Sequence, residues 1–293
     1  MWTSKSTYKI ANELNKYQYR AGRKIVGRIL AGLDYSLQAN KKTREGSGHI
    51  DRNRQFEYIN AKTIFFQSQK NPVLSVDTKK KENIGNYKNN GKEYCPKRNP
   101  REVEGHDFTN KNKGKVAPYG IYDITLNKGW VSVGINNDTA QFAVNSIRSW
   151  WYEMGQKSYA DATKIFINAD GGGSNGYRLR LWKIELQKLA NELDKSIHVS
   201  HFPPGTSKWN KIEHKMFCFI SANWKARPLI DRVTVVNLIA NTKTKTGLTI
   251  KAKLDETIYQ KGIKITDEEL GKINITRSEF HGEWNYIIRP HRN

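Results

Sequence analysis

Hydrophobic positions near the start of the chain recur with the spacing of two short helices. They are Ile10, Leu14 and Tyr17 in the first helix, and Ile25, Val26, Ile29, Leu30 and Leu33 in the second. A serine or threonine at positions 6 and 7 suits the start of the first helix, and the stretch QYRAG supplies a glycine turn between the two. The pattern predicts a helix-turn-helix-like segment over residues 1–36.

The outer side of the second predicted helix is basic. Arg23, Lys24 and Arg28 lie there, as in a helix that enters a DNA groove. Residues 1–50 contain ten Lys and Arg residues against three Asp and Glu residues, so this part of the chain is positively charged. The alternative is that two amphipathic helices simply pack on the main domain. A polar, turn-rich stretch at 37–52 is expected to be a linker.

Beyond this stretch, apolar runs of strand length alternate with helical patterns. The strand-like runs are PVLSV, KIFINA and SIHVSHF, and YGIYDITLNKGWVSVGI has the composition of a hairpin. Helical patterns cover residues 54–70, residues 139–153 and a segment that ends near Asp194. This order is typical of an α/β fold with a mixed sheet flanked by helices, and we assign the domain to residues 53–225.

The other segments have weaker patterns. Residues 79–117 are rich in Lys, Asn and Gly, and we expect exposed loops or a small ribbon there. Residues 226–293 are expected to form an extension that packs on the α/β domain. Within it, TDEEL offers a capping box from Thr266 to Glu269 for one short helix.

Charge is the strongest feature of the composition. The 293 residues include 50 Lys and Arg against 28 Asp and Glu, a formal net charge of +22. This favours a polyanionic partner, nucleic acid first, although merely soluble basic proteins share the balance. Two cysteines, Cys95 and Cys218, cannot build a disulfide framework or a four-cysteine zinc site. No apolar run approaches the roughly 20 residues that cross a bilayer, so we expect a soluble, cytoplasmic protein.

A glycine-rich loop, INADGGGSNG, follows the strand-like run KIFINA. Gly171, Gly173 and Gly176 match the G-x-G-x-x-G pattern of dinucleotide sites. Such a site also needs an acidic residue at the end of the next strand, which here ends in SHFP, and Asp170 would repel the phosphates. No Gly-Lys-Ser/Thr follows, which excludes a Walker-type loop. The glycines are better explained as space around Asp170.

Two aspartates follow apolar strand-like runs. Asp77 comes after PVLSV and Asp170 after KIFINA, where strand ends deliver side chains to the edge at which ligands collect in α/β sheets. An aspartate after a strand is also a common turn former or helix cap. Two such strand ends make that explanation weaker.

Glu213 provides a third carboxylate. At helical spacing its neighbours are Trp209, Met216 and Phe217, which places the carboxylate beside an apolar stripe. Glutamate seldom tolerates such a position without a partner. We expect a divalent cation there, the alternative being a salt bridge to Lys208, Lys211 or another basic residue.

Carboxylates from two strands and a helix suit Mg²⁺, with Mn²⁺ as a substitute, because these cations take oxygen ligands. Two ions roughly 3.5 to 4 Å apart would activate the attacking oxygen and stabilise the leaving one in phosphodiester chemistry. His198, His201 and His214 suggest zinc instead. Alternation along the strand IHVSH, however, places positions 198 and 201 on opposite faces.

Five stretches of the chain resemble one protein family. SVDTKKKE, INADGGGSNG, WKIELQKLA, HFPPGTSKWNKIEHKMF and FHGEWNY are similar to bacterial insertion-sequence transposases of the Rhodopirellula-type DDE transposase family. The likeness runs from STYKIANEL to NYI, most of the chain. PPGTSKWNKIEH is long enough to be highly specific, whereas the spacing of the three acids would be weak alone.

The resemblance implies an RNase H-like fold. In such a fold the first strand carries one aspartate, the fourth ends in the second, and the glutamate lies on a following helix; Asp77, Asp170 and Glu213 match those positions. The resemblance also implies that metal-activated water cleaves the transposon end and that the freed 3′-hydroxyl attacks target DNA. No covalent enzyme intermediate is expected. Lys208 and Lys211 flank the glutamate and are candidates for phosphate contacts.

Double-stranded DNA, both transposon ends and target, is the implied partner. Handling two ends together implies a homodimer or higher oligomer, bound to the bacterial nucleoid. Related transposases usually carry a longer N-terminal DNA-binding region, whereas this sequence begins almost at the helix that precedes the predicted recognition helix. A truncated copy or an alternative start codon would explain the difference. Two alternatives stay open: a non-catalytic DNA-binding regulator of the element, and an RNase H-like nuclease or resolvase with a cellular role.

Overall fold

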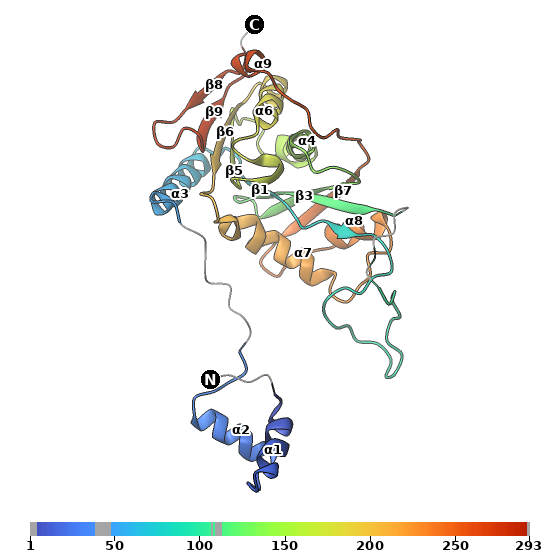
Figure 1. The fold of residues 1–293 in the computed structure, drawn as a ribbon. Coiled ribbons are helices and arrows are strands. Elements are labelled where there is room, and N and C mark those ends of the chain that lie inside the picture. Colours follow the sequence, from blue (N-terminus) through green and yellow to red (C-terminus); the bar gives the residue numbers. More distant parts are fainter. Residues whose placement is uncertain (1–4, 39–47, 107, 109–112, 292–293) are drawn as a thin grey trace. The chain divides into compact units, whose positions relative to one another are not determined.

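The computed structural model describes residues 5–38, 48–106, 108 and 113–291. The chain divides into two compact units, Met1–Gly46 and Ser47–Asn293 (Figure 1). The linker expected at 37–52 lies largely outside the described residues, and the domain boundaries assigned from the sequence stay predictions. None of the described helices is both long and apolar enough to cross a membrane.

The first unit contains the two predicted helices, α1 (Thr7–Lys16) and α2 (Arg23–Gly32). The Ser6 hydroxyl caps α1 by accepting a hydrogen bond from the backbone N–H of Lys9 (3.3 Å). Gly22 stands at the start of α2. The helices therefore begin where the capping residues and the glycine turn predict.

The contact between α1 and α2 buries little. Ala11 and Val26 are buried, but Ile25 and Ile29, two other apolar positions of the helical pattern, are 45% and 49% exposed. Leu33 is exposed as well. Only one side of a ten-residue helix can face its single partner in the described part of this unit, which explains why these three side chains are exposed.

In the second unit, nine strands of the described residues form one mixed sheet in the order β7-β4-β3-β1-β5-β6-β9-β8, with β2 paired to β3 outside this path. The strands are β1 (Val73–Thr78), β2 (Glu82–Asn83), β3 (Lys115–Asp123), β4 (Lys128–Gly134), β5 (Lys164–Ala169), β6 (Ser196–His201), β7 (Thr249–Asp255), β8 (Ile275–Arg277) and β9 (Asn285–Ile288). The hairpin β3–β4 is antiparallel, β1 is antiparallel to β3, and β1, β5 and β6 run parallel. The predicted strands and the mixed α/β class are confirmed.

Helices pack against this sheet (Figure 1). They are α3 (Arg52–Ser68), α4 (Ala140–Trp150), α5 (Gln156–Ser158), α6 (Arg180–Leu193), α7 (Cys218–Asn223), α8 (Arg232–Ala240) and α9 (Asp267–Gly271). The helix expected at 139–153 continues beyond Trp150 as a π-helical turn. The capping box at Thr266 and Glu269 is present at the start of α9 and is confirmed.

Alternate residues of each strand feed cores on opposite faces of the sheet. Leu74 and Val76 of β1 belong to the larger core, which α4 and α6 cover with side chains such as Trp150 and Trp182. Val73, the residue before Leu74, points to the other face and packs with Phe66 of α3. On the hairpin side, the segment from Ile212 through α7 and α8 covers the second face. The central strands are thus buried on both faces, as their continuous apolar runs predict.

Candidate active site

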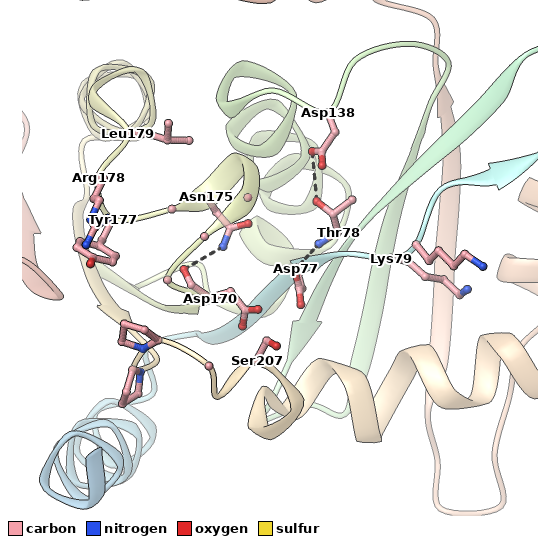
Figure 2. A pocket seen from close by; sticks show the side chains of 18 of the residues that line it. Asp77, Thr78, Lys79, Asp138, Asp170, Asn175, Tyr177, Arg178, Leu179 and Ser207 are labelled. Atoms are coloured by element: carbon pink, nitrogen blue, oxygen red, sulfur yellow. Dashed lines mark hydrogen bonds between the residues drawn. The ribbon is translucent and has the colours of Figure 1, made fainter. Parts of the chain in front are cut away.

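Parallel pairing at the centre of the sheet brings Asp77 and Asp170 together. Val76 of β1 lies opposite Ala169 of β5, and the residue that follows each of them is an aspartate. Neighbouring strands lie about 4.8 Å apart, and Figure 2 shows both carboxylates entering the same hollow. Asp77 lies on the first strand, and Asp170 follows the fourth when the two-residue β2 is set aside. This is the placement expected of an RNase H-like fold.

Glu213 begins a π-helical turn, Glu213–Phe217, that leads into α7. Two glycines let this turn lie directly on the sheet. A Cβ at Gly120 of β3 would lie 2.5 Å from a ring carbon of Phe217, and one at Gly129 of β4 would lie 2.3 Å from the sulfur of Met216. Since any larger residue would push the turn outward, the hairpin glycines set the height of Glu213 above the sheet.

Trp209 was expected one turn before Glu213 on the same helix, and this was wrong. It lies in a separate 3₁₀ turn, Ser207–Trp209, and is 51% exposed. The reason is that Asn210 adopts an extended backbone (φ −60°, ψ 124°) and interrupts the helix. Met216, in the same turn as Glu213, is buried, as expected.

The buried amide of Asn210 connects the elements that carry the three acids. Its Nδ2 donates to Oδ1 of Asp170 (3.2 Å) and to the carbonyl of Val76 (3.0 Å). Its Oδ1 accepts from the Ser75 hydroxyl, whose oxygen in turn accepts from the backbone N–H of Ile212 (3.0 Å). One side chain therefore joins β1, the end of β5 and the start of the Glu213 turn.

Asp77, Asp170 and Glu213 line one cleft with a volume of about 950 Å³. Burial, followed by the charge of Asp170, raises the pKa of Asp77 to about 8. Burial raises the pKa of Asp170 to about 6, although the hydrogen bond from Asn210 lowers it. Burial also raises the pKa of Glu213, against the nearby charge of Lys79. The three carboxylates resist ionising together unless a cation compensates them.

In the part of the chain that the structure describes, Asp77, Asp170 and Glu213 do not form one compact group of donor atoms. Among the described residues, the group of three donor atoms within 4.8 Å of one another is His49, Asp51 and His281, not the three acids. Two ions about 3.5 to 4 Å apart, each about 2.1 Å from its ligands, connect oxygens up to about 8 Å apart. Carboxylate oxygens are also the donors that Mg²⁺ and Mn²⁺ prefer.

Asp138 is a fourth acid that the sequence analysis missed. It lines the adjoining part of the cleft with Asp77 and Asp170, and its Oδ1 accepts a hydrogen bond from the Thr78 hydroxyl (3.2 Å; Figure 2). Its charge also contributes to the raised pKa of Asp77. Its position before α4 gave no signal in the sequence, because a polar residue there is typical of a helix start.

The glycine loop does not have the geometry of a dinucleotide site. After Asp170 the chain makes a 3₁₀ turn, Gly173–Asn175, and α6 begins only at Arg180. A dinucleotide loop would lead directly into the helix that binds the pyrophosphate. The exclusion of that site from the sequence agrees with this arrangement.

His198, His201 and His214 have separate partners. His198 packs edge-on against Phe66 with ring centroids 4.9 Å apart, and burial lowers its pKa to about 3. The buried His201 donates its Nδ1–H to the Asp170 carbonyl (2.8 Å). His214 instead bonds the carbonyl of Lys208. These contacts exclude a zinc site built from all three.

Of the two lysines predicted beside Glu213, Lys208 lines the cleft, and its ammonium lies 5.3 Å from the Trp209 ring. Lys211 is exposed but is not among the residues that line the cleft. The sequence analysis missed Lys79, which pairs with Glu82 (3.2 Å), and the neighbouring lysines at 80 and 81, which line the cleft. The run of three lysines at 79–81, which begins two residues after Asp77, was the available signal.

Arg23, Lys24 and Arg28 are exposed on α2. Val26, between them in sequence, points into the contact with α1 and is buried. The basic side chains therefore lie on the outer side of the helix. Their contact with DNA stays a prediction.

A separate cluster joins the residues before α3 to the loop between β8 and β9. His281 bonds Asp51 through Nε2 (3.0 Å) and Glu283 through Nδ1 (2.8 Å). Its ring stacks on Trp284 with centroids 4.2 Å apart, and the His49 ring lies edge-on to both. Burial lowers the pKa of His281, but the two carboxylates together raise it above its ordinary value. The cluster fastens the start of the second unit to its last hairpin.

Comparison with known proteins identifies one family. The family described as "Rhodopirellula transposase DDE domain" matches residues 1–290. No curated protein matches the chain. Solved structures with a similar fold include "Mos1 transposase paired-end complex with left transposon end" (11% identity, 79% of this chain, 64% of that chain, TM-score 0.46) and "Crystal structure of a pre-cleavage Mos1 transpososome" (11% identity, 79% and 65%, TM-score 0.46). The matched region thus spans less than two thirds of those chains.

The family match covers nearly the whole chain, including both units and the residues Asp77, Asp170 and Glu213. It agrees with the resemblance that the sequence motifs showed. The chain belongs to the Rhodopirellula transposase DDE domain family.

Proposed function

We propose that this chain is a DDE transposase that cleaves DNA phosphodiester bonds at the ends of an insertion sequence and transfers the freed strands into target DNA. Asp77, Asp170 and Glu213 are the proposed ligands of two Mg²⁺ ions, for which Mn²⁺ can substitute. The proposal goes beyond family membership in naming the reaction, the ions and the residues.

One observation carries the proposal. Three carboxylates from distant parts of a strongly basic chain line one cleft, and each has a raised pKa with burial as its main cause. Uncompensated acids destabilise a fold, so such a cluster points to a role in binding cations. The net charge of +22 supports a polyanionic substrate.

In this mechanism the chain's own residues hold the metal ions and fix the orientation of the carboxylates that bind them. Asp77 and Asp170 contribute oxygens from adjoining strands, and Glu213 closes the cleft from the π-helical turn. The amide of Asn210 fixes one oxygen of Asp170 and leaves the other for a ligand. Bound divalent ions would activate the attacking oxygen and stabilise the leaving one. The buried sheet beneath keeps this geometry rigid.

DNA binding is proposed for two surfaces, each within one unit. Arg23, Lys24 and Arg28 on α2 would contact a DNA groove, and Lys208 and Lys211 would contact phosphates near the cleft. Because two element ends are joined in one reaction, we propose a homodimer or higher oligomer on DNA. Activity on the bacterial nucleoid follows from that partner.

The test uses the purified full chain, Mg²⁺ or Mn²⁺, and a labelled duplex that carries the inverted repeat flanking the gene. The wild-type protein should nick the repeat end and join it to a second duplex, and Asp170→Asn should abolish both products. Asp161→Asn is the matched control, since this exposed aspartate precedes the opposite end of β5.

Two results would contradict the proposal. Equal cleavage by Asp170→Asn and wild type would remove the carboxylates from the reaction. Salt-sensitive duplex binding without any metal-dependent cleavage would instead identify a DNA-binding regulator.

A further inference from the structure

Gly172 has no structural reason to be glycine, unlike its neighbours in the loop. A Cβ at Gly171 would lie 3.2 Å from the Phe202 carbonyl, Gly173 has a φ of +70°, and a Cβ at Gly176 would lie 3.2 Å from the loop backbone. A Cβ at Gly172 would meet nothing within 4 Å, and its φ of −130° is open to any residue. Neither packing nor conformation within the chain accounts for it.

The loop that presents Gly172 is held in place. The buried Asn175 donates through Nδ2 to the carbonyl of Asp170 (3.5 Å). The buried Ser174 hydroxyl lies 3.3 Å from that of Thr78 on β1. Gly172 is therefore an exposed point on a loop anchored to the strands that carry the acids, which suits a surface that a ligand approaches closely.

A trough with a volume of about 810 Å³ lies over this loop. Figure 2 shows Asp77 and Asp170 on one side of it and Tyr177 and Arg178 on the other. Pro203 and Pro204 line it as well. Pockets that bind ligands of nucleotide size have volumes of about 300 to 1,000 Å³. The trough is thus a continuation of the acidic cleft with room for a neighbouring nucleotide.

Arg178 supplies a positive charge, suited to a phosphate, on the side of the trough away from Asp77 and Asp170. Its side chain is exposed, and its guanidinium lies 5.2 Å from the ring centre of Tyr177. This cation–π contact restricts the guanidinium to the trough wall and leaves its N–H groups directed to other acceptors. Guanidinium groups bind phosphate with two parallel hydrogen bonds.

These observations point to a subsite for the DNA backbone. We propose that the trough binds the nucleotide next to the cleaved bond, with its sugar against Gly172 and its far phosphate on Arg178; this rests on the proposed cleavage at Asp77 and Asp170. Gly172 is glycine because a Cβ would occupy the space of the sugar. The subsite is indifferent to base identity, since both contacts are to the backbone.

The experiment adds methyl groups at this one position. Gly172→Ala should lower the single-turnover cleavage rate about tenfold and Gly172→Val about a hundredfold, since a displacement of about 1 Å costs that much. Gly271→Ala is the matched control, because a Cβ there also meets nothing within 4 Å. Thermal unfolding and Mn²⁺ binding by electron paramagnetic resonance should be unchanged in both alanine variants and in Gly172→Val.

The proposed contact between Arg178 and a DNA phosphate is tested by removing the charge of either group. A duplex with a neutral methylphosphonate at the phosphate next to the cleaved bond should be cut more slowly by wild type. The Arg178→Ala variant should cut the natural duplex at that same reduced rate and lose nothing further on the modified one. Additive losses would overturn the assigned contact.

The outcomes separate this inference from the proposed function. If wild type cleaves and Gly172→Val cleaves equally well, or if Gly172→Val loses Mn²⁺ binding, the subsite is refuted while the proposed function stands. If wild type does not cleave at all, the proposed function fails. Duplex affinity in Ca²⁺ then decides the subsite: equal affinity of wild type and Gly172→Val refutes it, and weaker binding by the variant supports it.

Discussion

Replacing Asp77 with asparagine should make the metal-free protein more stable while abolishing cleavage. The carboxyl group is partly buried near Asp170, and its pKa is raised to about 8. Asparagine has the shape of the protonated acid and keeps the oxygen that accepts from the backbone N–H of Thr78 (2.7 Å). The substitution therefore removes the cost of a buried charge without removing the hydrogen bond.

The sign and size of the effect follow from proton linkage. The folded chain holds the proton of Asp77 up to about pH 8, whereas the unfolded chain releases it near 3.8, its ordinary pKa. Stability is thus lost as pH rises from about 4 to about 8. One pKa unit corresponds to about 1.4 kcal/mol, so the loss at pH 7 is about 4 kcal/mol if the cleft stays dry. Water that reaches the partly exposed carboxyl reduces this loss.

The assay is urea unfolding followed by tryptophan fluorescence, in EDTA, between pH 4 and pH 9. Seven of the eight tryptophans lie within Ser47–Asn293, so the signal reports on the unit that contains the cleft. Asp77→Asn should match wild type at pH 4 and exceed it increasingly up to pH 8. Asp161→Asn should follow wild type at every pH.

The reasoning fails if Asp77→Asn is less stable than wild type at pH 8. It also fails if the difference between the two proteins is the same at pH 4 and pH 8, because a titrating group must produce a slope. Confirmation would show that the acid is retained at the expense of stability, as expected of a functional group.

Three further predictions concern the surroundings of the cleft. Asn210→Leu removes the acceptor of the Ser75 hydroxyl and the side-chain donor to the Val76 carbonyl, and should lower the free energy of unfolding by about 2 to 5 kcal/mol; unfolding in urea with no change in midpoint would contradict this. Gly120→Ala should force the Phe217 ring outward, cost about 1 to 3 kcal/mol and weaken Mn²⁺ binding by calorimetry, and an unaltered affinity would show that the Glu213 turn is not set by this glycine. Mn²⁺ at a hundred times its Kd should stabilise wild type by about 2.7 kcal/mol. A fixed Mn²⁺ concentration should stabilise it more at pH 8 than at pH 6, because protons must leave the carboxyls before the ion binds. Thermal shifts measure this effect, and an equal shift in Asp170→Asn would rule out the cleft as the binding site.

Central elements of the fold are predictable from the sequence because their signals are local. β1, β5 and β6 are buried on both faces and therefore appear as short apolar runs that end in turn residues. β7 and β9 escaped prediction. The segment TIKAKLD of β7 alternates polar and apolar residues, a strand signal that the sequence analysis did not use. β9 has only four residues, and its sequence differs little from a loop until it pairs with β6.

The acids of the candidate site could be predicted from the motifs and from their positions at strand ends. The residues that position these acids could not. Asn210 was hidden inside a stretch expected to be helical, and its role depends on contacts with Ser75 and Val76 far away in the sequence. Gly120 sits in a strand, where a glycine is usually read as a weak point. Only the packed turn of Met216 and Phe217 shows why no side chain fits there.

The last 70 residues complete the sheet at both margins, with β7 beside β4 and β9 beside β6. During synthesis, the backbone N–H and C=O groups on the outer sides of β4 and β6 therefore stay unpaired until β7 and β9 have been made. A fragment that ends near residue 225 would contain every proposed metal ligand but would expose two edge strands with unpaired backbone groups. Premature termination should thus yield aggregates, and a shortened copy of the gene would be self-limiting.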